Sequence, residues 1–192
     1  MIELRSGLQI QTGHTLLLDE QMLNDGNCLS VSKGLVRVAM SKPDQEALDA
    51  QPITLGFLRA GDHLPLELLR NNRLHLQALS TTQLDTACPS LPPAGASSLS
   101  DWTVALLCIR HLSDAEQRIA ALLQLLVQRL GSRNGNWYEL PLRLTHAELA
   151  ELSGHTRVTI TKQLSRWKES GLIQQDRGAN STLRMAPELI ET

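Results

Sequence analysis

A basic segment in the last quarter of the chain holds the residue types that could do chemistry. Residues 153–168 contain Arg157, Lys162, Arg166 and Lys168 and no acidic side chain, although the whole chain has a net charge of −2. Local positive charge of this kind attracts a polyanion whatever the net charge of the molecule. The segment therefore predicts contact with phosphate groups.

The spacing of apolar residues gives this segment two faces. Ile160, Leu164 and Trp167 recur at helical spacing and would face a core. The other face then holds short polar groups, cations and one apolar group, and an arginine near the start of a helix can reach the O6 and N7 acceptors of guanine. We expect contacts with base edges from Arg157, Val158, Thr161 and Lys162.

Two helices joined by a tight turn are predicted to hold this face in place. Thr145 opens a capping box, Gly154 ends the first helix, and Thr156 caps the second. A small residue, a glycine four positions later and an apolar residue six after that is typical of a helix-turn-helix, here Ala150, Gly154 and Ile160. The side chains expected to contact the DNA backbone are Thr145, His146, Thr156, Thr159 and Arg166.

The elements around the helix-turn-helix are also marked by short signals. Ser113 and Glu116 have the spacing of a capping box, which predicts the start of a helix that Gly131 stops. Residues 132–137 are predicted as a loop and 138–142 as a short strand. Residues 171–185 predict a β-hairpin wing, because a polar turn separates two strand-like runs.

The N-terminal half predicts short strands without helices between them. Val36, Val38 and Met40 alternate with other residues at period two, and Gly34 separates this run from the strand before it. Residues 41–52 are polar and carry two prolines, which predicts a long hairpin loop. Such a series of strands favours an antiparallel barrel or roll.

A break rich in Pro, Gly and Ser at residues 89–98 precedes a predicted helix with Ser98 or Ser100 as its N-cap. Its apolar residues occupy two faces, so the helix is expected to be buried on two sides. One face includes Val104, Leu107 and Cys108. The other has the spacing of a coiled-coil seam and is expected at a dimer interface, although a plain core helix stays open: Leu99, Trp102, Leu106 and Ile109.

The arrangement resembles the Crp/Fnr superfamily of bacterial transcription regulators. The best match runs from DAEQRIAALLQLLVQRLG through LTHAELAELSGHTRVTITKQLSRWKESGLI, and SKGLVRV and LRAGD resemble turns of the family's β-roll sensor. The resemblance implies a homodimer with paired recognition helices in successive major grooves. The implied α+β fold has an antiparallel β-roll of the cupin or jelly-roll kind, like a cyclic-nucleotide-binding domain (residues 1–97), a connecting dimerisation helix (98–112) and a winged helix-turn-helix (113–192).

The recognition segment departs from the commonest family version. Many members have a glutamate where Val158 stands, and valine cannot accept a hydrogen bond from cytosine but can contact a thymine methyl. The Arg-Val-Thr form resembles the cyanobacterial global nitrogen regulator, whose half-sites are of the GTA…TAC type. We therefore expect Arg157 to read a guanine and Val158 the neighbouring thymine, with Lys162 adding a base or phosphate contact.

The sequence argues against the cofactors known in this family. A cyclic-AMP pocket needs a Gly-Glu-Leu turn and an Arg-Ser/Thr-Ala segment, and neither Glu67 nor Arg73 stands in such a context. An Fe–S cluster needs four thiolates, whereas the chain has three cysteines. Haem held by His63 or His75 with a cysteine is disfavoured because a lone strand histidine is usually a surface or satisfied core residue. No cofactor is evident.

The effector stays unknown from the sequence. A small carboxylate would need basic groups inside the roll, for which Arg70, Arg73 and Arg110 are candidates, although each is more simply a solvated surface residue. The expected partners are double-stranded DNA, a second copy of the chain and RNA polymerase. No apolar run reaches the ~18 residues of a membrane span and no signal peptide is recognised, so a cytoplasmic bacterial protein without a membrane partner is expected.

Two other functions compete with DNA binding. The first is a small-molecule sensor whose winged helix contacts protein. The second is a metal enzyme, because β-rolls resemble cupin barrels, but His63 and His75 lack a nearby glutamate at ligand spacing. We expect no enzymatic activity.

Overall fold

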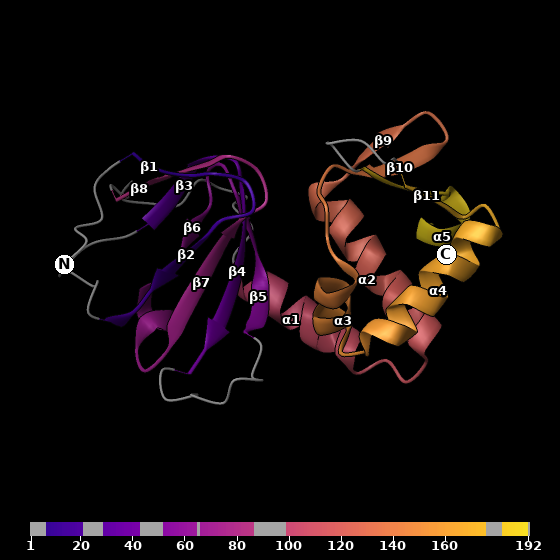
Figure 1. Cartoon of the computed structure of the whole chain (residues 1–192), viewed down its shortest axis with the longest axis horizontal. Helices are drawn as coiled ribbons and strands as arrows, with labels where there is room; N and C mark the ends of the chain where they lie inside the picture. The colour runs from indigo at the N-terminus through magenta and orange to yellow at the C-terminus, as the bar shows by residue number, and fades with distance from the viewer. Residues whose placement is uncertain are drawn as a thin grey trace. The chain divides into compact units, whose positions relative to one another are not determined.

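The chain forms two compact units, residues 1–104 and 105–192, and helix α1 (Leu99–Arg110) crosses the boundary between them (Figure 1). The predicted domain bounds at 97 and 112 stay a prediction. The computed structural model describes residues 7–20, 29–42, 52–64, 66–86, 99–175 and 182–191.

The first unit contains two four-stranded antiparallel sheets, as predicted for a β-roll. Their buried faces share one aliphatic core that draws on both sheets, for example Val31 and Leu84 from one and Val36 and Leu76 from the other. One sheet holds β1 (Leu8–Ile10), β8 (Thr82–Asp85), β3 (Leu29–Lys33) and β6 (His63–Leu64). The other holds β2 (Thr15–Leu18), β7 (Arg73–Ala78), β4 (Leu35–Ser41) and β5 (Ile53–Arg59), and the 3-10 helix η2 spans Leu66–Leu69.

The turn between β3 and β4 confirms the predicted glycine hinge. Gly34 has a φ of +95°, and a Cβ atom there would lie 2.6 Å from the carbonyl oxygen of Thr81. The alternation predicted for the following strand holds at Val36 and Val38, which are buried while Arg37 is only partly buried. It breaks at the register shift after Val38, where Ala39 is buried and Met40 is only partly buried. Residues 43–51 of the predicted hairpin loop lie outside the described residues.

The first turns of helix α1 pack directly against strand β5, and Gly56 allows the helix to approach the strand closely. A Cβ atom on Gly56 would lie 2.3 Å from the Cβ of Trp102, so no side chain fits there. The Trp102 ring packs edge-on against Phe57 at a centroid distance of 5.0 Å, and the Thr103 hydroxyl donates to the Leu55 carbonyl at 2.9 Å. Ser98 lies outside the described residues.

The structure corrects the dimer contact predicted on α1. The single chain already buries the predicted seam, so those side chains have no surface left for a second subunit. The exposed apolar side chains of the helix are Val104 and Leu107, 60% and 57% exposed, beside the exposed Cys108. Ser100 lies inside the helix and is not its N-cap. The four buried residues are Leu99, Trp102, Leu106 and Ile109, exposed by 3%, 1%, 4% and 8%.

The second unit is a helical cluster edged by one four-stranded antiparallel sheet in the order β11-β12-β10-β9. The predicted loop at 132–137 is a hairpin, because Gly135 adopts a φ of +59° and lets β9 turn into β10. The wing strands pair as predicted, with residues 176–181 between them outside the described residues. The elements are α2 (Ala115–Leu130), β9 (Ser132–Asn134), β10 (Trp137–Leu140), α3 (His146–Ser153), α4 (Arg157–Glu169), β11 (Ile173–Gln175), β12 (Leu183–Met185) and α5 (Pro187–Ile190).

Helix α2 starts one residue later than predicted. Asp114, not Ser113, is its N-cap, and the Asp114 carboxylate accepts from the backbone N–H of Gln117 at 2.7 Å. The reason is that Glu116 does not turn back to complete a capping box, since its carboxylate accepts from the Trp167 indole N–H at 3.1 Å. No helix of the described residues is long and apolar enough to span a membrane.

Candidate nucleic-acid interface

Three side-chain or backbone signals shape the helix-turn-helix as the sequence predicts. The Thr145 hydroxyl accepts from the N–H of Glu148 at 3.2 Å, and the Glu148 carboxylate accepts from the N–H of Thr145 at 2.7 Å. Gly154 ends α3 in the left-handed conformation, with φ +71°. Thr156 caps α4 by accepting from the N–H of Thr159 at 3.2 Å.

Packing then fixes which face of α4 points away from the protein. Ile160 and Trp167 are 0% and 4% exposed, and Leu164 is partly buried. On α3, Ala150 is 6% exposed, and its small side chain permits a close approach of the two helices. The side of α4 opposite these residues must therefore face solvent.

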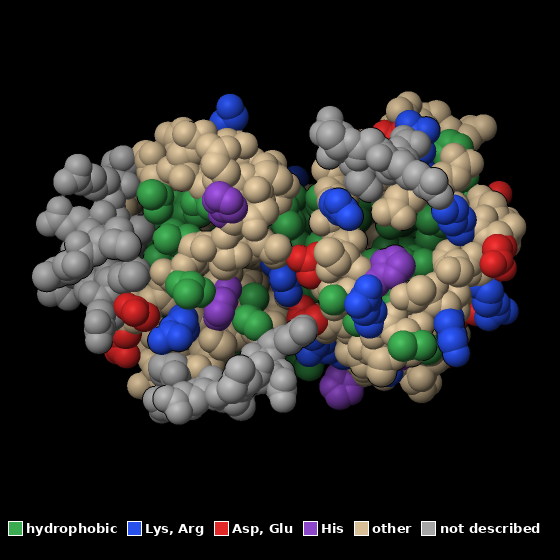
Figure 2. All heavy atoms as spheres, in the orientation of Figure 1, with side chains coloured by type: hydrophobic (Ala, Val, Ile, Leu, Met, Phe, Trp, Pro, Cys, Tyr) green, Lys and Arg blue, Asp and Glu red, His purple; other side chains and the backbone are tan. Residues whose placement is uncertain are grey.

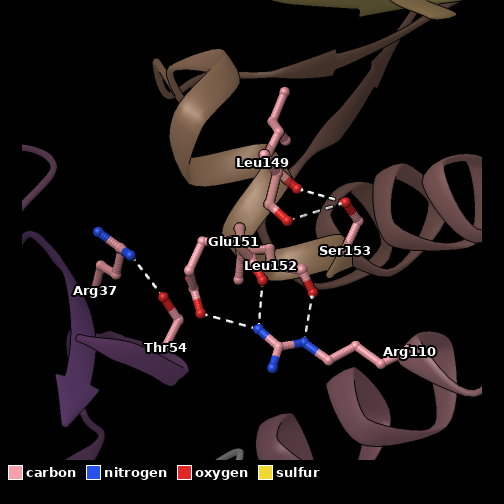
Figure 3. A network of polar contacts seen from close by, with 8 residues as sticks. Arg37, Thr54, Arg110, Leu149, Glu151, Leu152 and Ser153 are labelled. Atoms are coloured by element: carbon pink, nitrogen blue, oxygen red, sulfur yellow. Dashed lines mark hydrogen bonds and ion pairs between the residues drawn. The ribbon is translucent and has the colours of Figure 1, made fainter. Parts of the chain in front are cut away.

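A cation from α1 caps the end of α3. The Arg110 guanidinium donates to the Leu152 carbonyl oxygen at 3.2 Å and to the Glu151 carboxylate at 2.9 Å, and it also donates to the Glu151 carbonyl. Figure 3 shows this fork at the last turn of α3, where Ser153 donates to the Leu149 carbonyl at 2.8 Å. A basic group here satisfies carbonyls that the helix leaves free. Arg110, a candidate from the sequence for binding an effector, thus stabilises the end of the first helix of the helix-turn-helix.

The solvent-facing side of α4 brings the predicted base-contacting residues together. Arg157, Thr161 and Lys162 are exposed, and Val158 is 62% exposed. Among the described residues, no hydrogen bond or ion pair engages the charged group of Arg157 or of Lys162. Figure 2 shows Lys and Arg side chains gathered over this part of the unit.

The residues predicted to contact the DNA backbone surround this face. Thr145 and Thr156 are exposed at the amino ends of α3 and α4, and Thr159 is partly buried. Arg166 is 73% exposed with one guanidinium nitrogen 3.7 Å from the Glu116 carboxylate, so most of its charge still faces solvent. The His146 ring nitrogen Nδ1 lies 2.9 Å from the Thr161 hydroxyl and joins α3 to α4.

Sequence reasoning missed three contacts that hold the interface. They are the fork of Arg110 on α3, the bond from Trp167 to Glu116, and the His146–Thr161 bond. Their partners lie 42, 51 and 15 residues apart in the chain. No local spacing rule connects residues so far apart, so no sequence signal for them was available.

One histidine of the turn has a perturbed pKa. Burial lowers the pKa of His155, and the positive charge of Arg118 lowers it further. The backbone N–H of His155 donates to the Ala150 carbonyl at 2.9 Å, which closes the turn. The neutral ring is therefore favoured beside the start of α4.

Of the two histidines considered for a sensor site, only His75 has a polar partner, since neither ring nitrogen of His63 makes a hydrogen bond within the described residues. His75 lies 2.9 Å from the Ser41 hydroxyl, and Arg37 donates to Thr54 at 2.8 Å and to Gln77 at 2.9 Å. His63 lies in β6 and His75 in β7, which belong to different sheets. Across the described ranges, no group of three or more His, Cys, Asp or Glu could hold a metal ion. Cys28 and Cys88 lie outside those ranges.

Both units match known families. Residues 8–98 match the cyanobacterial CRP family N-terminal domain, and residues 117–191 match the Crp-like helix-turn-helix domain. The regulatory protein CysR of Synechococcus elongatus is 40% identical over 128 residues, which cover 64% of this chain and 62% of that protein. The match therefore spans less than two thirds of the length of CysR.

Solved structures share the fold. The CRP/FNR family transcriptional regulator TTHA1359 from Thermus thermophilus superposes with a TM-score of 0.65 at 21% identity, covering 97% of this chain and 98% of its own. A CooA mutant from Carboxydothermus hydrogenoformans gives a TM-score of 0.65 at 23% identity, covering 96% and 84%. Because a Crp-family model matches each of its two parts, over residues 8–98 and 117–191, the chain belongs to the Crp/Fnr family of transcription regulators.

Proposed function

We propose that the protein is a sequence-specific DNA-binding transcription regulator that acts as a homodimer. The observation that carries the proposal is the exposed face of α4, where Arg157 and Lys162 extend into solvent beside the 62% exposed Val158. Unpaired cations next to an exposed apolar group fit a major groove, which offers both acceptors and methyl groups.

The proposed base contacts follow from the chemistry of each side chain. Arg157, at the first turn of α4, reads a guanine through its two acceptors, and Val158 contacts the methyl of the next thymine. Thr161 and Lys162 lie one turn further along the same face. These contacts predict half-sites of the GTA…TAC type.

Phosphate contacts would hold α4 at the right depth in the groove. Thr145 and Thr156 lie at helix amino ends, where free N–H groups and the helix dipole favour an anion. His146, Thr159 and Arg166 would add contacts on either side. Such contacts set register and affinity but carry little sequence information.

A second copy of the chain would double this surface. We place the dimer contact on the exposed side of α1, at Val104 and Leu107, because exposed apolar side chains one turn apart can pair with their symmetry mates. Two-fold symmetry would set the recognition helices about 34 Å apart, one turn of B-DNA. Bound in the bacterial cytoplasm, such a dimer would change the access of RNA polymerase to a promoter.

Selection of duplexes from a random pool tests the proposal. We expect a palindromic site with GTA…TAC half-sites, and an affinity that falls linearly with salt on a log–log plot as phosphates are neutralised. A matched protein with Arg157→Ala should lose preference for the guanine. Failure to retain any duplex, even at low salt, would instead favour a winged helix that contacts protein.

A further inference from the structure

The hydroxyl group of Thr161 is already engaged on the face proposed to bind DNA. It donates to the Arg157 carbonyl one turn earlier at 2.9 Å, and it also lies 2.9 Å from Nδ1 of His146. A hydroxyl has one hydrogen and two lone pairs. Because the carbonyl must accept, that single hydrogen belongs to the bond with Arg157.

The direction of the second bond follows from the first. With the Thr161 hydrogen committed, His146 must donate through an Nδ1–H group, and Thr161 accepts. The hydroxyl then cannot donate to the base acceptors guanine O6, guanine N7 or thymine O4. Thr161 is nevertheless exposed, so its side chain can still offer a base its methyl group and the second lone pair of its hydroxyl. Of these two, only the methyl group matches a feature that thymine presents in the major groove.

We infer that Thr161, oriented by His146, recognises a second thymine through its methyl group. The inference rests on the proposed DNA binding and names what the face recognises: two thymine methyls on neighbouring base pairs. Val158 and Thr161 are three residues apart, about 4.5 Å along the helix axis, and base pairs are about 3.4 Å apart. In a GTA half-site the third base pair also contains a thymine, on the opposite strand.

Replacing thymine by deoxyuridine tests this directly, because uracil lacks only the 5-methyl group. The full chain is titrated against the selected duplex, and against duplexes carrying one uracil at a time, by fluorescence anisotropy at fixed salt. We expect affinity to fall about fourfold, the worth of one buried methyl, at two neighbouring base pairs of each half-site. Uracil elsewhere in the duplex should have no effect.

Variants assign each methyl to a side chain. Thr161→Ser keeps the hydroxyl and both of its hydrogen bonds but lacks the methyl, so it should bind thymine and uracil equally at one of the two positions. Val158→Ala should do the same at the other position. Thr103→Ser on α1 is the matched control, because it also removes the methyl of an exposed threonine whose hydroxyl donates to the carbonyl four residues earlier, that of Leu99 at 2.9 Å. It should preserve both thymine preferences.

His146 is a positioning residue in this scheme, and the thymine-to-uracil ratio measures that role. His146→Ala should lower the ratio at the Thr161 position and leave it unchanged at the Val158 position. A residue that contacts only phosphate would weaken binding to both duplexes equally and leave both ratios unchanged. An unchanged ratio at the Thr161 position would therefore remove His146 from the inference.

The outcomes separate the two proposals. One outcome would overturn the inference but not the proposed function. In it, the duplex binds in a salt-dependent way and keeps its affinity when uracil replaces the thymine assigned to Thr161. Retention of the thymine preference by Thr161→Ser would also overturn it. A pool that yields no bound duplex would overturn the proposed function and the inference with it.

Discussion

At the residue scale, Val158 is the side chain that we propose selects a base most directly. It is 62% exposed at the first turn of α4, and it offers only methyl groups to a partner. A carboxylate in the same place would accept a hydrogen bond from the amino group of cytosine, which valine cannot do. Under the proposed contacts, the identity of this one residue would decide between an apolar and a polar contact with the same base pair.

Val158→Glu should shift the selected base from thymine to cytosine at the position next to the guanine. The expected discrimination is about 1–3 kcal/mol in favour of cytosine. Parallel selection with the two proteins from one random pool measures it, and Gln128→Glu, at an exposed glutamine of α2, controls for the same added negative charge. Recovery of thymine by both proteins would contradict the assignment of Val158 to this base.

Single residues also show where sequence reasoning succeeds. The caps at Thr145 and Thr156 were predictable because each binds a backbone group three residues away, and helix geometry fixes that distance. Ser113 was a wrong prediction because its partner Glu116 binds Trp167 from another helix. Local rules hold until a distant residue competes for the same group.

At the element scale, Arg110 connects the last turn of α1 to the end of α3. Arg110→Met keeps most of the apolar length but leaves two carbonyl groups and the Glu151 carboxylate without this donor. We expect the free energy of unfolding to fall by about 1–2 kcal/mol. Urea unfolding of the full chain measures the loss. Arg143→Met, at an exposed arginine of the same unit, should be nearly neutral, and equal stability of the two variants would contradict the capping role.

The outer face of strand β7 predicts a pH dependence of stability. Burial lowers the pKa of His75, and the charges of Arg73 and Arg37 lower it further. In the unfolded chain this histidine has a pKa of about 6.5, so on acidification the unfolded chain binds a proton more readily than the native chain does. Stability from this residue is therefore complete above that pH and is lost as the pH falls toward the lowered native value.

We expect the urea concentration at the unfolding midpoint to decrease when the pH is lowered from 7.5 to 5.5. The decrease should be smaller in His75→Gln. The variant removes the titrating ring from the β7 face, while other sources of acid sensitivity remain. His14→Gln, at an exposed histidine of the same unit, is the matched control and should follow the wild type. An unchanged pH response in His75→Gln would show that this ring does not contribute.

Element types and order were largely predictable, while the use of their faces was not. Alternation identified the strands around Gly34, and capping signals located α3 and α4. Helix α1 is apolar on two sides, so periodicity could not say which side faces its own unit. The contact with Gly56 determines which side is buried, because the missing side chain at that position allows Trp102 to pack against β5.

At the scale of the whole molecule, the proposed regulator depends on two copies binding together. A single recognition helix gains little affinity, whereas linked half-sites bind as one unit through a high effective concentration. The exposed Val104 and Leu107 are the residues that would join the copies. Family membership was predictable from the helix-turn-helix motif, but this surface required the structure.

Leu107→Glu should produce a monomer and weaken binding to the palindromic duplex by about a hundredfold or more. Sedimentation velocity measures the assembly, and anisotropy measures the affinity. Leu17→Glu is a matched control, because Leu17 is a 47% exposed leucine on a sheet, whereas Leu107 is 57% exposed. A Leu107→Glu protein that stays dimeric would place the contact elsewhere.

The bonds that join Arg157, Thr161 and His146 all run in one direction, from ring to hydroxyl to carbonyl. Because this chain of bonds starts on α3 and ends on the first turn of α4, any displacement of α3 would carry Thr161 and Arg157 with it. The two helices would therefore enter a groove as one rigid piece, and a tilt of either would move the base-reading residues of the other.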